Sequence, residues 1–369
     1  MKFLVITNAP TLKENNLWVA YAPYVREMDL WFAHVDQVTL LSPTQYDAPL
    51  LTKAFKRQDV TVKAIPAIQL NGLFQSLRSA VLLPILLFKI FTAMKKADHI
   101  HLRCPGNIGL LAAVVQILFP KKPKTVKYAG NWDPKASQPW SYKLQKRILS
   151  HPKWSKNMEV LVYGQWENQS PNITPFFTAS YTQKQLRPTP PFELPQTIHL
   201  LFVGSLSSGK RPMYVVQFLK MCIDRGINCR LDIYGDGVER DGLHQFIKRH
   251  DLDKQVTLHG NQPSAIIEKA YQNAQFLLLP SRSEGWPKVV AEAMFWGVIP
   301  LVTPISCVPW MLDAGNRGIL LSLVLEEDVS AFAKALSDPS QLVHMAQNAQ
   351  DWARQYTLEA FERAVIEKL

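Results

Sequence analysis

Short apolar runs alternate with longer amphipathic stretches along the first half of the chain. The apolar runs predict strands over 2–8, 37–43, 60–66, 99–105, 124–130 and 158–164. Helical periodicity falls between several of them, over 17–35, 75–96 and 106–118. Strands that alternate with helices indicate βαβ units and a parallel sheet.

A second alternating series begins near residue 198. It predicts strands over 198–205, 229–237, 255–261, 275–281 and 298–303. The helices between them are expected over 211–225, 239–250 and 263–273, with a further one that begins near 287. Each of these strands ends in Gly, Ser, Asn or Thr. In doubly wound sheets ligands bind beyond the carboxyl ends of the strands, so these ends are where a site is expected.

The segment "LRPTPPFELPQ" (186–196) separates the two series. Four prolines in eleven residues make it extended and semi-rigid, as an interdomain linker would be. We therefore expect an N-terminal domain over 1–190 and a C-terminal domain over 197–350, and the remaining residues 351–369 have a helical pattern. A length of 369 residues agrees with about two domains.

Composition narrows the class of protein further. The four cysteines form no C-x-x-C pair, which argues against a disulfide framework or a zinc site and makes a reducing cytoplasm the default. The N-terminal "MKFLVITNAP" is typical of a first strand rather than of a signal peptide. The apolar stretch 79–91 contains Pro84 and Lys89 and is shorter than the roughly 20 residues that cross a membrane.

The net charge of +11 is unevenly distributed. Residues 1–194 contain 24 Lys and Arg against 11 Asp and Glu, a balance of +13, and residues 195–369 contain 17 against 19, a balance of −2. A basic half favours an anionic partner: nucleic acid, an acidic lipid surface or a phosphorylated substrate. The sign of the charge does not choose among these.

The first strand of the second series ends in "GSLSSGKRP" (204–212). Its glycine and serines let backbone NH groups converge, and Lys210 and Arg211 stand at the start of a helix, where an anion is favoured. The spacing is not that of a Walker loop, because Arg211 stands where Ser or Thr is required. The stretch is either a diphosphate cradle or an exposed turn with surface cations.

Glycine turns follow the next two strands, in "IYGDG" (233–237) and "LHGN" (258–261). Gly235, Gly237 and Gly260 would let a ligand approach the backbone closely, although each is also an ordinary turn residue. Together they place three loops of small residues at one edge of the predicted sheet.

The same edge carries "SRSEGWPKVVAEAMFWG" (281–297), in which seven residues separate Glu284 from Glu292. Pro287 suits the first turn of a helix, so Glu284 is expected in the loop before it and Glu292 on its first two turns. A carboxylate can accept two hydroxyl hydrogen bonds, which suits the vicinal diols of a ribose or a hexose. The alternative is a surface helix with solvated acids, but Glu292 lies among apolar neighbours.

The pattern "LFVGSL…GKRP…DIYGDG…VTLHGN…LLLPSRSEGWPKVVAEAM-WG-IPLV" resembles the family-four retaining glycosyltransferases of the GT-B fold. The resemblance is strong over 198–303 and extends to the rest by layout. It implies an α/β chain with two Rossmann-like domains that face each other across a cleft, the N-terminal one binding the acceptor and the C-terminal one a nucleotide-sugar. The C-terminal helix over 351–369 would return to the N-terminal domain.

The resemblance assigns a role to the motif residues. Glu284 would touch the donor sugar, Glu292 would hold the nucleotide ribose and Lys210 would bind phosphate, so Glu284 and Lys210 are the catalytic candidates. The full set of residues expected to bind the donor is Gly204, Ser205, Lys210, Arg211, Gly235, Gly237, Gly260, Asn261, Ser281, Glu284, Gly285, Trp286, Pro287, Lys288 and Glu292.

The chain departs from the family at three places. Ser205 stands where an arginine is common, so one phosphate contact is either missing or taken over by Arg211. The loop 7–16 after the first strand has no glycine. Gly130 and Asn131 replace a histidine that many members carry, which removes any role based on that histidine.

The acceptor is expected to meet polar loop residues of the N-terminal domain, namely Arg103, Asn107, Asn131 and Asp133. Asp133 could act as a base or orient the acceptor. Arg26 and Glu27 are expected to be a pair on a helix surface instead. The stretch 141–156 mixes Lys and Arg with Trp, Leu and Ile, and is either a solvated basic helix or a surface that docks on anionic lipid.

The resemblance therefore implies a retaining hexosyltransferase with a saccharide or a lipid-linked acceptor, in bacterial surface polysaccharide or glycolipid synthesis. It is expected in the cytoplasm, either free or peripherally attached to the inner face of the membrane. No cofactor and no metal are expected, since Lys210 and helix-terminal NH groups would stabilise the departing diphosphate. A non-catalytic nucleotide-sugar- or saccharide-binding protein of the same fold is the alternative. Nucleic acid is not expected as a partner, because no nucleic-acid-binding motif is found.

Overall fold

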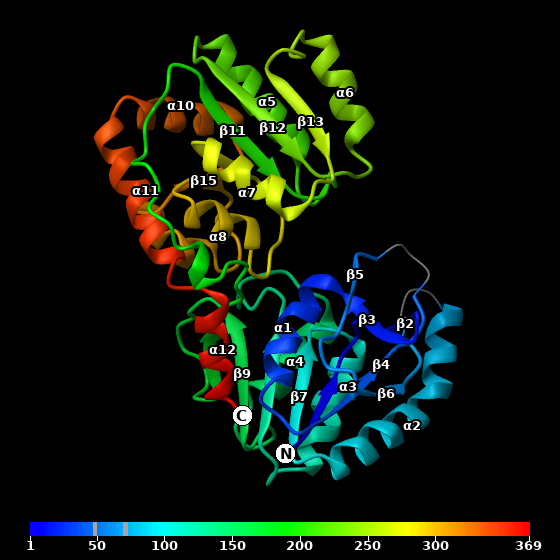
Figure 1. Ribbon diagram of the computed structural model, residues 1–369. Helices are drawn as coiled ribbons and strands as arrows, with labels where there is room; N and C mark the ends of the chain where they lie inside the picture. The colour runs from blue at the N-terminus through cyan, green and yellow to red at the C-terminus, as the bar shows by residue number, and fades with distance from the viewer. Residues whose placement is uncertain (47–49, 69–72) are drawn as a thin grey trace. The chain divides into compact units, whose positions relative to one another are not determined.

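The computed structural model describes residues 1–46, 50–68 and 73–369 (Figure 1). The chain divides into two compact units, one formed by Met1–Phe177 together with Phe361–Leu369 and the other by Thr178–Ala360. Each unit is a parallel sheet covered by helices, as expected from the alternation of apolar runs and amphipathic stretches.

The first unit contains a seven-stranded parallel sheet in the order β10-β9-β8-β7-β1-β4-β6. Its strands are β1 (Lys2–Ile6), β4 (Gln37–Ser42), β6 (Thr61–Ala64), β7 (His99–Cys104), β8 (Lys124–Tyr128), β9 (Met158–Tyr163) and β10 (Ile173–Phe176). Its helices are α1 (Ala22–Phe32), α2 (Leu73–Lys96), α3 (Asn107–Val115) and α4 (Trp140–Leu149), with a short 3-10 turn over Gln116–Leu118. The side chains of residues 73–81 lie outside what the structure describes.

A small antiparallel sheet in the order β2-β3-β5 was not expected from the sequence. Its strands are β2 (Leu12–Glu14), β3 (Leu17–Tyr21) and β5 (Thr52–Ala54). The helix predicted over 17–35 was therefore wrong at its start, because Leu17–Tyr21 pairs with both neighbours as a strand and α1 begins only at Ala22.

The core of the first unit has a different character on the two faces of its sheet. One face is apolar and packs Leu4, Ile100 and Val126 against residues of α2 and α3. The other face carries buried polar groups: His99 and His101 both contact the Thr125 hydroxyl, at 3.0 and 2.8 Å. The indole ring of Trp31 on α1 lies 4.5 Å from the imidazole of His101, measured between ring centroids.

Helix α12 (Leu358–Ile366) carries the chain from the second unit back to the first. Phe361 is 1% exposed and makes edge contacts with the rings of Phe176 and Phe177, at centroid distances of 5.4 and 5.8 Å. The expected return of the C-terminal helix is thus seen from Phe361 onward, rather than over the whole of 351–369. Figure 1 shows this red helix beside β9.

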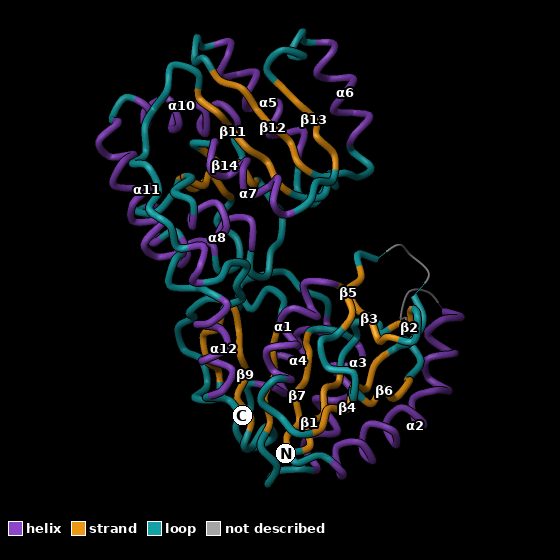
Figure 2. Tube along the Cα trace, in the orientation of Figure 1, coloured by secondary structure: helices purple, strands orange, loops and turns teal. Residues whose placement is uncertain are grey.

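The second unit is built on a six-stranded parallel sheet in the order β13-β12-β11-β14-β15-β16, drawn in orange in Figure 2. Its strands are β11 (Ile198–Val203), β12 (Cys229–Tyr234), β13 (Val256–Gly260), β14 (Phe276–Leu279), β15 (Ile299–Val302) and β16 (Ile319–Leu320). Its helices are α5 (Pro212–Asp224), α6 (Arg240–Arg249), α7 (Ser264–Asn273), α8 (Lys288–Phe295), α9 (Val308–Met311), α10 (Leu325–Leu336) and α11 (Pro339–Ala353), with 3-10 turns over Gln183–Gln185 and Asp313–Gly315. The strand order reverses between β11 and β14, which is the point where doubly wound sheets bind ligands.

The proline-rich segment 186–196 is not the linker that its composition suggested. It belongs to the second unit and packs along it. The Phe192 ring makes an edge contact with Phe276 on β14 at 5.9 Å, and the Thr189 hydroxyl accepts a hydrogen bond of 2.7 Å from Gln350 on α11. These contacts anchor the segment, and the chain passes between the units at residues 177 and 178 instead.

Among the described parts of the chain, no helix is long and apolar enough to cross a membrane. All four cysteines are free and buried.

Candidate functional site

The carboxyl ends of β11, β12 and β13 are joined by backbone hydrogen bonds. The NH group of Gly204 donates to the carbonyl of Tyr234 at 2.9 Å, and the NH group of Gly235 donates to the carbonyl of Gly260 at 2.8 Å. The NH group of Leu206 donates to Asp236 at 2.9 Å. The three glycine loops predicted from the sequence therefore form one continuous surface at the edge of the sheet.

Gly235 and Gly237 are required by neighbouring backbone. A Cβ atom on Gly235, whose φ is +139°, would lie 1.8 Å from the Gly204 carbonyl oxygen. A Cβ atom on Gly237, with φ of +157°, would lie 2.5 Å from the carbonyl oxygen of Leu206. From the sequence we expected these glycines to allow the close approach of a ligand. The contacts between the loops are sufficient to require glycine at both positions.

Lys210 and Glu284, the two catalytic candidates, form an ion pair with each other. Lys210 comes from the loop before α5 and Glu284 from the loop before α8. The lysine side chain is 26% exposed and that of the glutamate 11%, so the pair is largely shielded from water. A cation and a carboxylate thus meet at the strand ends, although 74 residues separate them in the chain.

Glu292 lies on α8 and uses both carboxylate oxygens. One accepts a hydrogen bond of 2.5 Å from the Ser180 hydroxyl, and the other accepts one of 3.2 Å from the phenol of Tyr271 on α7. Tyr271 is fully buried, and burial together with the charge of Glu292 raises the pKa of its phenol well above the usual range. Two hydroxyl donors therefore orient the carboxylate of Glu292. This disagrees with the alternative prediction that Glu292 lies on a solvated helix face.

The loop between Glu284 and α8 is fixed by hydrogen bonds from the segment that follows β15. The hydroxyl of Ser306 and the thiol of Cys307 both donate to the Gly285 carbonyl, at 3.1 and 3.2 Å. The Trp286 side chain is 6% exposed and packs among Trp310, Trp352 and Tyr356. Trp286 was predicted to bind the donor, but its ring is part of an aromatic cluster, so only its backbone remains available for such a role.

The other predicted donor residues of this edge are more open. Ser205 is exposed and its hydroxyl lies 3.3 Å from that of Ser207, and Asn261 is exposed as well. Pro287 is buried at the start of α8, where Lys288 is the first helical residue. Arg211 and Ser281 line a pocket at the neighbouring strand ends, which is described below.

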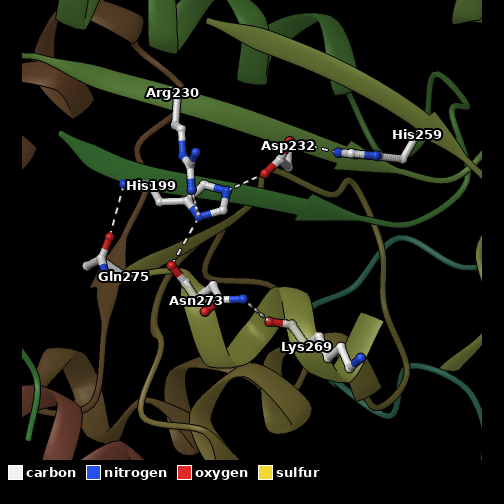
Figure 3. A network of polar contacts seen from close by, with 7 residues as sticks. All are labelled: His199, Arg230, Asp232, His259, Lys269, Asn273 and Gln275. Atoms are coloured by element: carbon white, nitrogen blue, oxygen red, sulfur yellow. Dashed lines mark hydrogen bonds and ion pairs between the residues drawn. The ribbon is translucent and has the colours of Figure 1, made fainter. Parts of the chain in front are cut away.

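A polar network that the sequence reading missed lies across β11, β12 and β13 (Figure 3). The two carboxylate oxygens of Asp232 contact the Nε2 atoms of His199 and His259, at 2.5 and 2.7 Å. The His259 ring stacks on Tyr234 at a centroid distance of 4.3 Å. Burial raises the pKa of Asp232, but the hydrogen bonds from the two histidines outweigh it and hold this pKa at about 2.

This network supports the glycine loops from within the sheet. His259 directly precedes Gly260, and Asp232 stands two residues before Tyr234, whose carbonyl binds Gly204. The available signal was the acid inside the apolar run "CRLDIYG", which a buried strand tolerates only with partners. The partners come from other strands, so they could not be identified from the local pattern around Asp232.

The acceptor candidate Arg103 lies at the end of β7 in the first unit. Its guanidinium pairs with Glu27 and its charge lies 5.3 Å from the ring centroid of Tyr24. Glu27 is 8% exposed while Arg26 is exposed, so the prediction of a surface pair of Arg26 and Glu27 was wrong. Burial has the largest effect on the pKa of Arg103 and lowers it. The charges of Glu27 and Tyr24 and the hydrogen bond to Glu27 together outweigh burial, so this pKa is raised overall.

The other acceptor candidates make local contacts. Asn107 donates to the Ile68 carbonyl at 3.1 Å. The side chain of Asn131 accepts from the NH of Asp133, and Asp133 in turn accepts from the NH of Lys135, both at 2.8 Å. These bonds shape the loops after β7 and β8, and the structure does not bring the four candidates into one cluster of hydrogen bonds.

Asn8 is a further residue that the sequence reading did not single out. It follows β1 in the loop that lacks glycine, and its side-chain oxygen accepts a hydrogen bond of 3.0 Å from the NH of Ile108 at the start of α3. The Asn8 amide fills the space beside Gly106, where a Cβ atom would lie 1.4 Å from it. A side chain thus satisfies the first turn of α3 from a distant loop.

Comparisons with known proteins agree with this arrangement. Residues 190–352 match the family model described as Glycosyl transferases group 1. An alpha-D-kanosaminyltransferase of Streptomyces kanamyceticus is 28% identical over 163 residues, which cover 44% of this chain and 42% of the relative. A putative colanic acid biosynthesis glycosyltransferase, WcaL, of Salmonella typhimurium is 27% identical over 153 residues, covering 40% of this chain and 37% of the relative.

These matches span about two fifths of the length of each curated relative. The crystal structure of Anabaena Alr3699/HepE in complex with UDP and glucose is similar over the whole chain, covering 100% of this one and 98% of that one. Its TM-score is 0.67 at 16% sequence identity. The fold is therefore that of the GT-B glycosyltransferases, with two Rossmann-like domains, and the prediction of the fold class is confirmed.

Proposed function

We propose that this protein is a retaining glycosyltransferase that takes a hexose from a nucleotide-sugar bound by the second unit. The observation that carries the proposal is the ion pair of Lys210 with Glu284 at the strand ends of the segment that matches the group 1 glycosyl transferases. Glu292 stands on α8, the helix that follows Glu284. The structure of HepE, which has a similar fold, contains UDP and glucose. That makes a uridine nucleotide the first donor to test.

Each of the three residues has a role in this proposal. Glu292, oriented by Ser180 and Tyr271, accepts the hydroxyl groups of the nucleotide ribose. Glu284 accepts hydroxyl groups of the donor sugar. Lys210 exchanges its contact with Glu284 for the diphosphate as the donor enters, and then stabilises the negative charge that grows on the leaving group.

Neither a metal nor a cofactor is needed in this proposal. Lys210 and the NH groups at the start of α8 supply positive charge where the diphosphate departs. Catalysis then comes from positioning and from electrostatic stabilisation.

The acceptor is proposed to be a saccharide or a lipid-linked saccharide that meets polar loops of the first unit. Synthesis of a bacterial surface polysaccharide or glycolipid would fit, and the relative WcaL is named for colanic acid biosynthesis. Arg103, Asn107, Asn131 and Asp133 remain the candidates for acceptor contacts. The paired Glu27 and Arg103 would orient a hydroxyl group rather than bind a free charge.

We also propose that the protein attaches reversibly to the cytoplasmic face of an anionic membrane through α4. Trp140 is 68% exposed and Trp154, just beyond the helix, is 40% exposed, with the cations of Lys143 and Arg147 between them in the chain. Lys146 does not belong to this surface. Its ammonium group donates to the Trp132 and Asp133 carbonyls at 2.7 and 3.2 Å, and burial lowers its pKa to about 8.

A non-catalytic nucleotide-sugar-binding protein is the second candidate. The observation in its favour is that Lys210 is already paired with Glu284, so the cation is not held ready for a leaving group. Lys210 must then be released by the donor for catalysis to occur.

A panel of UDP-, GDP- and ADP-sugars separates the two candidates. Any donor that binds the native state raises the melting temperature by mass action, and both candidates predict this. Only the enzyme consumes that donor, by slow hydrolysis in water and by faster transfer when an acceptor is present. NMR of the product would then show that the anomeric configuration is retained. Stabilisation without turnover, equal in the wild type and Lys210→Ala, would favour the binding protein, and no stabilisation by any donor would contradict both.

A further inference from the structure

The second unit contains a pocket of about 470 Å³ at the carboxyl ends of β14, β15 and β16. Of the residues predicted to bind the donor, Arg211 and Ser281 line this pocket, whereas Lys210, Glu284 and Glu292 do not. The pocket is lined by Arg211, Ser281, Arg282, Thr303, Pro304, Ile305, Leu321, Ser322 and Leu323.

Arg211 and Arg282 both line this pocket, and hydrogen bonds join the two loops that carry them. The guanidinium of Arg211 donates to the Pro280 carbonyl at 3.0 Å, and the backbone NH of Arg282 donates to the Gly209 carbonyl at 2.8 Å. Within the described chain neither arginine forms an ion pair with a carboxylate. Burial lowers the pKa of Arg211, and the like charge of Arg282 lowers it further.

The carboxylate of Asp328 is hydrogen-bonded to two residues of the pocket wall. Asp328 accepts hydrogen bonds from the backbone NH groups of Ser322 and Leu323, at 2.7 and 3.0 Å, and from the phenol of Tyr214. It is 3% exposed and holds the loop before α10. Neither Arg211 nor Arg282 is among the described donors to this carboxylate.

Arg211 also has an unfavourable backbone conformation. It is the residue before α5, with φ of +51° and ψ of +51°, a left-handed conformation that suits glycine and costs other residues about 1 kcal/mol. Strained conformations of this kind cluster at functional sites. A glycine would relieve the strain but would remove the guanidinium.

Ser281 adds an unsatisfied polar group. It is 1% exposed, and among the described residues its hydroxyl has no hydrogen-bond partner. Its carbonyl accepts from the hydroxyl of Thr303 at 2.6 Å, which fixes the backbone of the pocket wall. A buried hydroxyl without a partner is costly, so such groups are usually matched by a partner or a ligand.

We propose that this pocket binds the phosphate group of a phosphorylated saccharide, held by Arg211, Arg282 and the Ser281 hydroxyl. Guanidinium groups recognise phosphate oxygens through paired hydrogen bonds. The volume exceeds that of a bare phosphate, and Ile305, Leu321 and Leu323 provide apolar wall for the attached sugar. Phosphate binding does not depend on sugar transfer, whereas the use of this ligand as an acceptor rests on the function proposed above.

The test is calorimetric titration of the full chain with glucose 6-phosphate, and separately with inorganic phosphate, at constant ionic strength and with saturating UDP. The wild type should bind both, and the sugar phosphate more tightly. Arg282→Gln should weaken binding about tenfold, as expected for loss of a hydrogen bond to a charged group. Arg249→Gln, a matched change at another exposed arginine of this unit, should leave affinity unchanged.

A second readout separates binding from a structural role. Arg282→Gln removes a like-charge repulsion and Ser281→Ala removes an unpaired hydroxyl, so neither should lower the melting temperature of the free protein, yet both should weaken phosphate binding. Unchanged affinity in Arg282→Gln would overturn the proposal. Competition between phosphate and UDP would overturn it too, by placing the phosphate in the nucleotide site. Phosphate binding without transfer to any acceptor would instead count against the enzymatic function alone.

Discussion

At the scale of single residues, the charged groups of the site are held by contacts between distant parts of the chain. Glu292 contacts Ser180, which lies 112 residues away, and Lys210 contacts Glu284, 74 residues away. Each contact joins separate segments of the second unit, so a substitution at one residue changes the charge balance of its partner.

The ribose contact proposed for Glu292 can be tested with a substitution that keeps the shape of the side chain. Glu292→Gln should lower affinity for UDP by about 1.5–3 kcal/mol, since hydrogen bonds to a charged group are lost. Calorimetry measures the change, and Glu193→Gln on an exposed loop is the control. An unchanged dissociation constant in a folded variant would return Glu292 to a structural role with Tyr271.

The buried histidines of the first unit predict a loss of stability in mild acid. Burial lowers the pKa of His99 to about 4, and that of His101 well below the usual range. The unfolded chain, with an ordinary histidine pKa near 6.5, binds a proton that folded His99 does not bind until about pH 4. Stability is therefore full above about pH 6.5 and falls as the pH drops toward 4, by about 2 kcal/mol for His99 alone between pH 7 and 5.

Hydrogen exchange of amides in β1 and β7, corrected for the intrinsic effect of pH, would measure this loss. His99→Gln should flatten the dependence, whereas His244→Gln, an exposed histidine of the second unit, should not change it. Equal protection of these strands at pH 7 and pH 5 in the wild type would contradict the prediction.

At the scale of helices and strands, the strongly buried parallel strands were predictable and the small antiparallel sheet was not. Runs such as Phe276–Leu279 and Ile299–Val302 are apolar along their whole length because helices cover both faces of the sheet. Strands β2 and β5 have three residues each, too few to show a period. The apolar residues of β3 continue into α1, so a single helix was expected there.

The site was predictable to a similar extent. The order of the loops along the sheet edge follows from the order of strands and glycines in the sequence. The network of Asp232 with its two histidines and the pocket at Arg282 depend on side chains from three or more elements. The spacing of residues along the sequence does not predict contacts between side chains of separate elements.

Helix α4 carries the prediction of membrane attachment. Each basic residue near an anionic bilayer contributes about 1 kcal/mol, so replacing Lys143, Arg147 and Lys153 together with glutamine should reduce binding to anionic liposomes more than tenfold. Co-sedimentation at low salt measures it, and added salt should weaken binding by screening. The control replaces Arg26, Lys53 and Lys56 with glutamine, an equal change of charge at and near α1 and β5.

Lys146→Gln is unsuitable for that experiment, since it would remove the bonds to the Trp132 and Asp133 carbonyls. Wild-type protein that stays in the supernatant at low salt with acidic lipid would refute membrane attachment. The basic surface would then be assigned to a soluble anionic acceptor.

At the scale of the whole molecule, the first unit is completed by a segment that follows the second in the chain. Phe361→Ala should destabilise the first unit by about 3–5 kcal/mol, the usual cost of removing a buried phenylalanine. Hydrogen exchange of β10 should increase, while that of β12 in the second unit should not. Ile366→Ala, at a residue of the same helix that is 49% exposed, should have little effect.

The position of Phe361 has a consequence for synthesis of the chain on the ribosome. Residues 1–177 emerge first, but the aromatic surface of Phe176 and Phe177 is left uncovered until Phe361 has left the exit tunnel. Translation at about 5–20 residues per second makes that delay roughly 10–40 seconds. Residues 178–360 can meanwhile fold as a contiguous segment. The first unit is thus completed only after residues 178–360 have been synthesised, and its nascent form must remain soluble, or be held by a chaperone, until Phe361 arrives.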